Sequence, residues 1–291
     1  MADHVAVLAA EAVEALAIRA DGTYVDATFG AGGHAALILT RLDPAGRLIA
    51  FDVDPSAQAR ALTDPRFTLV CTNFRTLAAS LDALGIARVN GVLFDLGVSS
   101  MQFGEGERGF SFRIAAPLDM RMDPTAGESA AQFLATRDER TIANTIYEYG
   151  EERASRRIAR AIVALRDAGT PVRDTLDLAN VVARATRIPG HAKIHPATRT
   201  FQALRIAVND ELGALREGLA AALQRTATGG RIAAISFHSL EDRIVKQTFR
   251  DDPRVRAVTR KPIVASDAEV AANPRARSAK LRVAERIEAA G

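Results

Sequence analysis

The sequence has a single cysteine, Cys71, among its 291 residues. One thiol can form neither an internal disulfide nor a cysteine-based zinc site, so the chain does not require an oxidising compartment. Cys71 lies in an apolar stretch, and we expect a buried, unreactive thiol. No spacing of His, Asp and Glu in the chain is typical of a metal site either, and we therefore expect no metal.

Long apolar runs are also missing, although hydrophobic residues make up 48% of the chain. Glu11 and Glu14 interrupt the apolar pattern near the N-terminus, and no run is long enough to span a bilayer. We therefore expect no signal peptide, no membrane contact and a soluble protein of the cytoplasm. The apolar content is still sufficient for a substantial core in one large domain or two smaller ones.

Aromatic residues are scarce at 5%, and tryptophan is absent. A nucleic-acid base that stacks on an aromatic ring would therefore have few partners in this protein. The stacking candidates are four phenylalanines near the motifs described below: Phe74, Phe103, Phe110 and Phe112.

The net charge is only +3, but the positive residues are clustered. The stretch from Arg184 to Arg205 has five cations and no carboxylate, and residues 243–291 carry twelve Lys or Arg against six Asp or Glu. A basic surface suits a polyanion, because neutralising phosphates releases their condensed counterions. Two interpretations stay open at this point, a nucleic-acid partner and a solvated face without a partner.

Short strands alternate with helical periods over the first hundred residues. We predict strands at residues 23–29, 47–52, 67–70 and 91–95, and helices at residues 5–18, 35–42 and 76–84, with Pro55 opening another. Such alternation indicates a parallel sheet that helices cover on both faces.

Near Ser99 the alternation stops, and residues 104–205 contain no convincing strand. A long helical pattern over residues 142–166 indicates a mostly helical insertion. The α/β pattern then resumes with elements expected at residues 208–223 (helix), 231–236 (strand) and 240–249 (helix). Residues 255–264 and 280–287 are expected to form a closing antiparallel pair, separated by a mobile loop at residues 266–278.

A glycine-rich loop follows the first predicted strand, with Gly30, Gly32 and Gly33 just ahead of a helix. Glycines permit positive φ and close approach of a ligand, and the start of a helix supplies free N–H groups. Asp52 follows twenty-two residues after Gly30, where a carboxylate can accept hydrogen bonds from both ribose hydroxyls. An ordinary tight turn would not explain that spacing.

Two cofactors fit this loop, because it also satisfies the relaxed dinucleotide fingerprint G-x-G-x-x-A. Three features favour S-adenosylmethionine over a nicotinamide dinucleotide. Asp26 inside the first strand suits an amino-acid-like ligand, Asp52 and Asp54 place two carboxylates at the ribose position, and a helix precedes the first strand. The residues by themselves leave both cofactors open.

Two more polar residues end predicted strands. Asp95 follows three apolar residues at the end of the fourth strand, where it could hold the cofactor or a substrate amine, or cap a helix. His238 follows the fifth strand and either lines the active site or is a structural histidine. Ser239 is expected to cap the next helix, with Asp242 at the capping-box spacing.

Nine motifs are spread in order over nearly the whole chain. They are His4–Leu8, Asp26–His34, Asp95–Ser100, Arg108–Phe112, Pro117–Asp123, Tyr149–Glu152, His195–Gln202, Ser236–Asp242 and Asn273–Ser278. With these motifs the chain closely resembles the bacterial small-subunit ribosomal RNA cytosine-N4 methyltransferases, the ribosomal RNA small subunit methyltransferase H family. Two departures are Cys71, where the family is expected to have histidine, and a segment between Val258 and Asn273 that is shorter than in some relatives.

The resemblance implies an α/β fold, a class I (Rossmann-like) S-adenosylmethionine methyltransferase with an inserted helical domain. The core would comprise residues 1–103 and 206–291, and residues 104–205 would be the substrate-recognition domain. The implied cofactor is S-adenosylmethionine, contacted by Gly32, Gly33, His34, Asp52, Phe74, Asp95 and Gln102. The implied reaction is methylation of a cytosine N4 amine in the decoding region of small-subunit ribosomal RNA.

Asp95 is the catalytic candidate for that reaction, together with the carbonyl of Leu96, because the conjugated amine must be made pyramidal. Arg199, Arg205 and His238 are candidate contacts to the RNA. The sequence is compatible with a monomer or a homodimer. Two rival classes stay open, a nicotinamide oxidoreductase and an RNA-binding assembly factor without catalysis.

Overall fold

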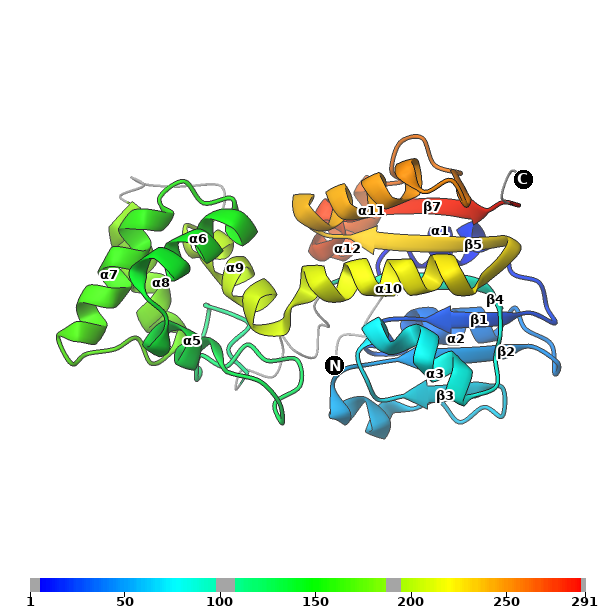
Figure 1. The fold of residues 1–291 in the computed structure, drawn as a ribbon, viewed down its shortest axis with the longest axis horizontal. Coiled ribbons are helices and arrows are strands. Elements are labelled where there is room, and N and C mark those ends of the chain that lie inside the picture. Colours follow the sequence, from blue (N-terminus) through cyan, green and yellow to red (C-terminus); the bar gives the residue numbers. More distant parts are fainter. Residues whose placement is uncertain (1–5, 98–107, 187–194, 289–291) are drawn as a thin grey trace. The chain divides into compact units, whose positions relative to one another are not determined.

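The computed structural model describes residues 6–97, 108–186 and 195–288. The chain divides into two compact units, one of Met1–Ser99 with Leu212–Gly291 and the other of Ser100–Glu211. Figure 1 shows the first unit as a sheet with helices on it and the second as a group of helices. No described helix combines the length and the apolar composition that crossing a bilayer requires.

The first unit is built on a seven-stranded sheet with the order β3-β2-β1-β4-β5-β7-β6. The strands are β1 (Thr23–Asp26), β2 (Arg47–Phe51), β3 (Phe67–Val70), β4 (Val89–Asp95), β5 (Thr226–Ser236), β6 (Val255–Ala257) and β7 (Lys280–Arg286). The strands β1 to β5 run parallel, and β7 is antiparallel to both β5 and β6. The chain reverses its direction across the sheet between β1 and β4, where sheets of this kind bind ligands.

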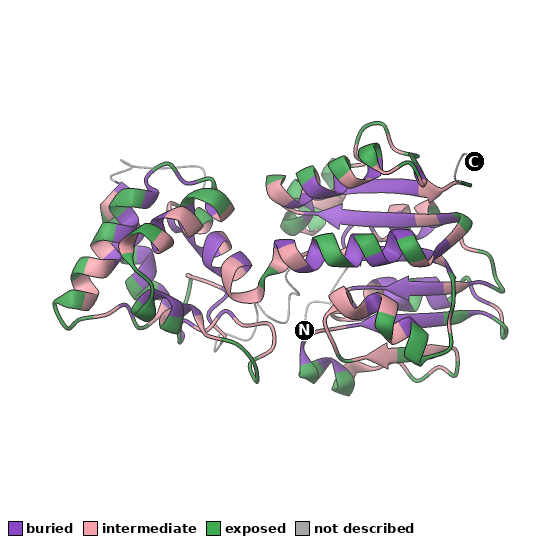
Figure 2. Cartoon of the chain, viewed as in Figure 1, coloured by how far each residue is buried: buried purple, intermediate pink, exposed green. Residues whose placement is uncertain are grey.

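Helices cover both faces of this sheet. They are α1 (Ala9–Ala15), α2 (Gly33–Leu39), α3 (Leu77–Ala83), α10 (Glu211–Arg225), α11 (Ser239–Asp251) and α12 (Asp267–Ala272), with 3₁₀ turns η1 (Pro55–Arg60), η2 (Phe74–Thr76) and η3 (Pro274–Ser278). Consecutive residues of β4, Val92, Leu93 and Phe94, are all fully buried although they point to opposite faces. Figure 2 shows the central strands in the colour of buried residues.

The predicted parallel strands and the closing antiparallel pair are confirmed, with β6 shorter than expected. The predicted mobile loop at residues 266–278 is wrong, because that segment forms α12 and η3. Ser266 caps α12 by accepting a hydrogen bond from the Glu269 amide at 3.2 Å. The Glu269 carboxylate accepts another from the Leu8 amide at 2.7 Å, which fixes the segment to the N-terminal region.

The expectation for Cys71 is also wrong. The residue is exposed, and its thiol donates a 3.4 Å hydrogen bond to the Gln58 side chain. Partial burial and the nearby Asp52 carboxylate raise the pKa of the thiol, which disfavours the reactive thiolate. The raised pKa thus belongs to a thiol that is not buried in the core.

The second unit is helical, as predicted. It contains α5 (Ala130–Thr136), α6 (Glu139–Gly150), α7 (Ser155–Asp167), α8 (Thr175–Thr186) and α9 (Ala197–Asn209). Its described residues form no strand, only an isolated bridge between Pro117 and Asp174. Ile142, Ile146 and Ile158 are fully buried and give this unit a core of its own.

The single helical pattern over residues 142–166 is two helices, α6 and α7. Glu151 adopts a left-handed conformation with φ 50°, which ends α6. A Cβ on Gly150 would lie 2.5 Å from the carbonyl oxygen of Arg199, so α9 packs directly against the backbone of α6 at this turn. Apolar periodicity continues across the break because α6 and α7 bury their apolar faces in the same core.

Two of the stacking candidates are part of the packing of this unit. The Phe112 ring stacks on His195 with 4.6 Å between centroids and meets Phe201 edge-on at 5.1 Å. Phe110 is 7% exposed and lies under the Arg108 guanidinium. Phe103 lies outside the described residues.

Candidate functional site

Polar residues gather at one edge of the sheet in the first unit, where its parallel strands end. The glycine loop follows β1, Asp52 follows β2, Asp95 ends β4 and His238 follows β5. Because parallel strands end at the same edge, side chains distant in the sequence come together there. This edge includes the reversal point between β1 and β4.

The glycine loop uses conformations and distances that side chains do not allow. Gly30 and Gly32 have φ of 54° and 81°, and Gly32 is the residue before α2. A Cβ on Gly33 would lie 2.9 Å from the Cβ of Ala6. The loop therefore turns sharply and lies directly against the N-terminal segment, in a conformation that larger residues would not allow.

Asp52 is held by the backbone of two loops. Its Oδ2 accepts a hydrogen bond from the Gly30 amide and its Oδ1 accepts one from the Asp54 amide, both at 2.9 Å. Burial raises the pKa of Asp52, and these two amides oppose the shift. Each carboxylate oxygen retains a lone pair for a further donor, so the residue can accept hydrogen bonds from the two hydroxyls of a ribose.

The His34 ring connects the N-terminal segment to Asp95. Its Nε2 lies 3.1 Å from the carbonyl oxygen of Val7, and a carbonyl only accepts, so Nε2 carries the proton. Its Nδ1 lies 3.5 Å from Oδ2 of Asp95, whose backbone amide donates to Thr28 Oγ1 at 2.7 Å. Thr28 thus fixes the backbone at Asp95, and the His34 ring lies beside the Asp95 carboxylate at the end of β4.

Asp26 is a buried carboxylate with an unused oxygen. Its Oδ1 accepts a hydrogen bond from the Thr28 amide at 3.1 Å, while Oδ2 has no hydrogen-bond partner among the described residues. Burial raises the pKa of Asp26 to about 6, against the opposing effect of His34. An orphaned acceptor next to two more carboxylates, Asp52 and Asp95, fits a cationic ligand such as the amine and sulfonium of S-adenosylmethionine.

The Phe74 ring is fixed beside the end of β3. It meets Phe94 edge-on with 5.5 Å between centroids. A Cβ on Gly218 of α10 would lie only 2.5 Å from its Cδ2, so α10 packs directly against the ring. Sequence reasoning missed Gly218, although a glycine inside a helical pattern costs about 1 kcal/mol relative to alanine and so indicates a packing reason.

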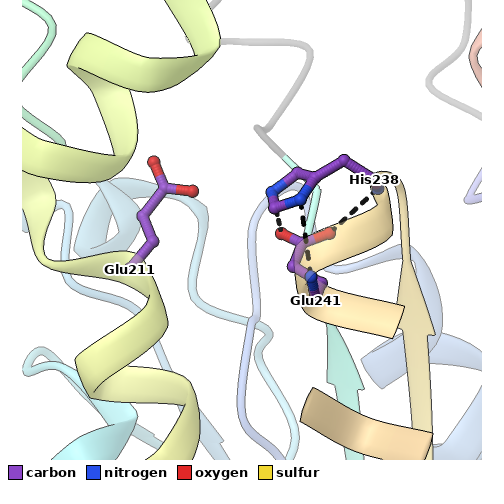
Figure 3. A group of neighbouring side chains, drawn as sticks. All are labelled: Glu211, His238 and Glu241. Carbon is purple, nitrogen blue, oxygen red and sulfur yellow. Dashed lines mark hydrogen bonds and ion pairs between the residues drawn. The ribbon is translucent and has the colours of Figure 1, made fainter. Parts of the chain in front are cut away.

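His238 directly precedes α11 and caps it, as Figure 3 shows. Its Nδ1 accepts a hydrogen bond from the Glu241 amide, and Glu241 Oε2 accepts from the amides of Phe237 and His238. The predicted capping box of Ser239 with Asp242 is therefore wrong by one residue. A histidine can take the capping position because its unprotonated ring nitrogen accepts like a serine oxygen.

Asp242 has a different partner. Its carboxylate accepts hydrogen bonds from the Arg282 guanidinium at 2.6 Å and from Lys280 at 3.3 Å, which ties α11 to β7. These cations hold the pKa of Asp242 below its ordinary value in spite of its partial burial. The Ser236–Asp242 motif thus has several structural roles, and an RNA contact by His238 stays a prediction.

The two arginine candidates lie in the second unit and differ from each other. Arg205 binds Glu211 through two hydrogen bonds of 2.7 and 2.8 Å, and its side chain is 15% exposed. Arg199 is 56% exposed and makes only a long hydrogen bond to the Glu151 carbonyl and a 3.9 Å contact to Glu152. Arg205 therefore has a structural role, Arg199 is the more exposed of the two, and an RNA contact by Arg199 stays a prediction.

The structure thus brings Asp26, Gly32, Gly33, His34, Asp52, Phe74 and Asp95 to one edge of the sheet in the first unit. Gln102, the remaining candidate, lies outside the described residues. Among the described residues of this unit, the arrangement offers acceptors for a ribose and for a cationic amine next to a glycine loop.

The chain is similar to known proteins over its whole length. The sequence pattern of the MraW methylase family matches residues 1–287. The ribosomal RNA small subunit methyltransferase H of Methylibium petroleiphilum is 55% identical over 308 aligned positions, gaps included. The alignment covers 98% of this chain and 96% of the relative. The protein of the same name from Thiobacillus denitrificans is 54% identical over 310 aligned positions, which cover 99% of this chain and 98% of the relative.

A solved structure is similar at lower identity. An rRNA methylase from Streptococcus thermophilus has a TM-score of 0.44 and 13% identity, with 96% of this chain and 95% of that chain covered. The similarity in sequence is therefore the informative one, and it extends over both units of the chain.

Proposed function

Because the chain belongs to the MraW methylase family, we propose that it methylates the exocyclic N4 amine of a cytosine in small-subunit ribosomal RNA, with S-adenosylmethionine as the methyl donor. Its fold is the Rossmann-like methyltransferase fold with a helical insertion. The observation that carries the proposal is the identity of 55% to a ribosomal RNA small subunit methyltransferase H over nearly all of both chains.

We further propose which residues at the edge of the sheet hold the cofactor. We assign the ribose hydroxyls to Asp52, whose two oxygens are already oriented by the amides of Gly30 and Asp54. We assign the cationic amino-acid part to the side of Asp26, and close backbone approach to Gly32 and Gly33. Phe74 supplies an apolar ring for the base, and Gln102 stays a predicted contact. When bound, S-adenosylmethionine supplies a methyl group that its sulfonium has already activated.

Asp95 is the proposed catalytic residue. The lone pair of the cytosine amine is conjugated with the ring, so the amine is a weak nucleophile until it is made pyramidal. A carboxylate that accepts a hydrogen bond from the amine favours that geometry and stabilises the positive charge that develops on nitrogen. The contacts of Asp95 to His34 and Thr28 fix its position for this role, and the carbonyl of Leu96 is a second candidate acceptor.

We propose that residues 104–205, which make up most of the second unit, are the substrate-recognition domain. Its most exposed candidate contact is Arg199, which can pair with a phosphate. The proposal includes neither a metal nor a membrane, and a homodimer stays a prediction. The proposal places the protein in the cytoplasm, where the small ribosomal subunit is found.

The decisive experiment is transfer of a labelled methyl group from S-adenosylmethionine to small ribosomal subunits isolated from cells that lack the protein. We expect label in the RNA, and N4-methylcytidine after digestion to nucleosides. Subunits from cells that contain the protein are the control and should accept little label, because their site is already methylated. Label on another base, or none, would contradict the proposal.

The same preparation separates the rival classes. A nicotinamide oxidoreductase would bind NADH in a fluorescence titration, and S-adenosylmethionine would not displace it. An assembly factor without catalysis would bind subunits but transfer no methyl group from the labelled donor. Naked ribosomal RNA as an alternative acceptor then tells whether the enzyme acts on RNA alone or on an assembled subunit.

A further inference from the structure

One motif, Asn273–Ser278, has no role in the site described above. It forms η3 immediately before β7. Lys280, the first residue of β7, is paired with Ser236, the last residue of β5. Because β7 runs antiparallel to β5, the residues that precede β7 lie at the carboxyl edge of the sheet, the edge that holds Asp52 and Asp95. Figure 1 shows α12, which precedes this turn, at the same end of β5.

This turn is fixed to the body of the first unit. The Asn273 side chain accepts a hydrogen bond from the Arg275 amide at 3.3 Å. Ala276 and Ala279 are each 1% exposed and belong to the apolar core. Arg275 and Arg277 flank Ala276 and are exposed. The backbone therefore presents two guanidinium groups at defined positions instead of on a loose tail.

Contacts also connect the turn to the glycine loop. Its neighbour α12 is bound to the N-terminal segment through Glu269, which accepts from the Leu8 amide at 2.7 Å. The same segment contacts the loop through Val7, whose carbonyl binds His34, and through Ala6, which packs against Gly33. A short path of direct contacts thus leads from the proposed cofactor site to the two arginines.

Arg277 is the cation of this turn without a partner among the described residues. The motif holds no carboxylate, and the Arg277 side chain forms no hydrogen bond or ion pair with any residue that the structure describes. Asp242, the carboxylate that binds Lys280 of β7, also binds Arg282.

We propose that Arg275 and Arg277 bind backbone phosphates of the RNA strand next to the cytosine that is methylated. The guanidinium fork matches two phosphate oxygens, and it stays charged at any physiological pH. A base presented to a methyl donor must leave its stack, and phosphate contacts on the flanking strand hold it in that position. The inference rests on the proposed function, because it takes RNA as the substrate.

The test compares wild-type protein with Arg277→Gln and with the double variant Arg275→Gln/Arg277→Gln. Binding of deproteinised small-subunit ribosomal RNA is measured over a range of salt concentrations. We expect the slope of log affinity against log salt to fall by about 0.7–0.9 for each arginine removed. The KM for RNA should rise about tenfold in the double variant, with the affinity for S-adenosylmethionine and kcat at saturating RNA unchanged.

Arg47→Gln is the matched control, because Arg47 is exposed at the start of β2, at the opposite edge of the sheet. It should leave the salt slope as in wild type. Arg277→Lys keeps the charge and should retain most of the slope. If Arg275→Gln destabilises the protein, the single Arg277 variants still decide the matter, since Arg277 has no described partner.

An Arg277→Gln variant with wild-type slope and wild-type KM for RNA would overturn the inference. A slope that falls equally in the Arg47→Gln control would overturn it too, because the effect would then be one of net charge. Failure of the proposed function looks different, since wild-type protein would then bind RNA with an Arg277-dependent slope and methylate none of it.

Discussion

The two ends of β1 differ in whether their buried polar groups are fully hydrogen-bonded. Tyr24, toward the amino end, is 1% exposed, and its hydroxyl accepts a 2.7 Å hydrogen bond from the Arg19 amide. Asp26, two residues later and on the same face of the strand, is fully buried and keeps one carboxylate oxygen without a hydrogen bond among the described residues. One strand thus contains a satisfied polar group and an unsatisfied charged one.

The neighbouring strand β4 repeats the contrast. Asn90 near its amino end accepts a 2.8 Å hydrogen bond from the Thr23 amide and so joins β4 to β1. Asp95 at its carboxyl end faces His34 at 3.5 Å, longer than an ordinary ion-pair hydrogen bond. Polar residues at the amino edge therefore stabilise the sheet, while the carboxyl edge contains a buried carboxylate oxygen, Oδ2 of Asp26, without a hydrogen bond among the described residues. We expect substitutions at the two edges to separate stability from activity.

The largest effect is expected from Asp95→Asn. The amide has nearly the shape of the carboxylate but cannot accept the developing charge of the amine, so methyl transfer should fall about 10³-fold, roughly 4 kcal/mol. Single-turnover transfer of labelled methyl to small ribosomal subunits measures this. Its counterpart in the same strand, Asn90→Ala, should lower the free energy of unfolding by about 1–2 kcal/mol and leave turnover of the folded protein unchanged. If Asp95→Asn transferred the methyl group at the wild-type rate, a catalytic role of Asp95 would be excluded.

The next effect concerns Asp26 and pH. The native pKa of about 6 lies above the ordinary value of 3.8, so the protonated carboxyl favours the folded state. The stability that this group contributes is complete below pH 4 and is lost as the pH rises through 6. Asp26→Asn removes that dependence on pH. The free energy of unfolding of the variant should be up to about 3 kcal/mol higher than that of wild type at pH 8, with little difference near pH 4.

Urea unfolding at both pH values tests this expectation, because contributions from other titrating groups cancel in the difference between the two proteins. Tyr24→Phe is the counterpart at the amino end of β1. Its free energy of unfolding should fall by about 1 kcal/mol at both pH values. The substitution removes the acceptor of the Arg19 amide but no group that titrates between these pH values. An Asp26→Asn variant that is equally stabilised at pH 4 and pH 8 would refute the assigned ionisation.

Local spacing explains what the sequence could predict. Gly30 to His34, Asp52 and Asp95 each follow an apolar strand, and parallel strands end at the same edge, so their proximity needs no knowledge of packing. The unsatisfied oxygen of Asp26 was beyond such reasoning, because it depends on what surrounds the end of β1 in three dimensions. The same applies to the position of the Phe74 ring, against which Gly218 of the distant helix α10 packs.

The wrong predictions have the same origin. Residues 266–278 have the charged, proline-flanked composition of a loop, yet a contact between Glu269 and Leu8, separated by 261 positions, fixes them. Ser239 is the better capping residue by preference, but β5 ends so that His238 occupies that position. Arg205 lies in a basic stretch and nevertheless pairs with Glu211. Each case is decided by a tertiary contact that competes with the local preference.

A third effect comes from Asp52→Ala, which removes both proposed acceptors of the ribose hydroxyls. We expect the Kd for S-adenosylmethionine to rise about 30-fold, or roughly 2 kcal/mol, as for loss of hydrogen bonds to a charged group. Calorimetric titration measures it, with Arg47→Ala at the amino end of the same strand as the control that should bind normally. Equal affinity in Asp52→Ala and wild type would exclude the ribose assignment.

The smallest expected effect concerns Gly218 and Phe74. It tests the difference between the two edges of the sheet most directly, because the substitution changes no polar group. Gly218→Ala places a methyl group 2.5 Å from Phe74 Cδ2, so the ring must move, while the helix itself gains about 1 kcal/mol of propensity. If the ring holds the cofactor base, the Kd for S-adenosylmethionine rises about fivefold, roughly 1 kcal/mol, without loss of stability.

Gly91→Ala is the counterpart at the amino edge, where a Cβ would lie 3.0 Å from the Tyr24 ring and 3.1 Å from the Arg231 carbonyl oxygen. It should lower stability and leave the Kd unchanged. The double variant Gly218→Ala/Phe74→Leu decides between a direct and an indirect effect. If Gly218 acts only by giving room to the ring, its substitution should change the Kd much less when the smaller leucine is present. Additive effects would mean that Gly218 and Phe74 affect the cofactor separately.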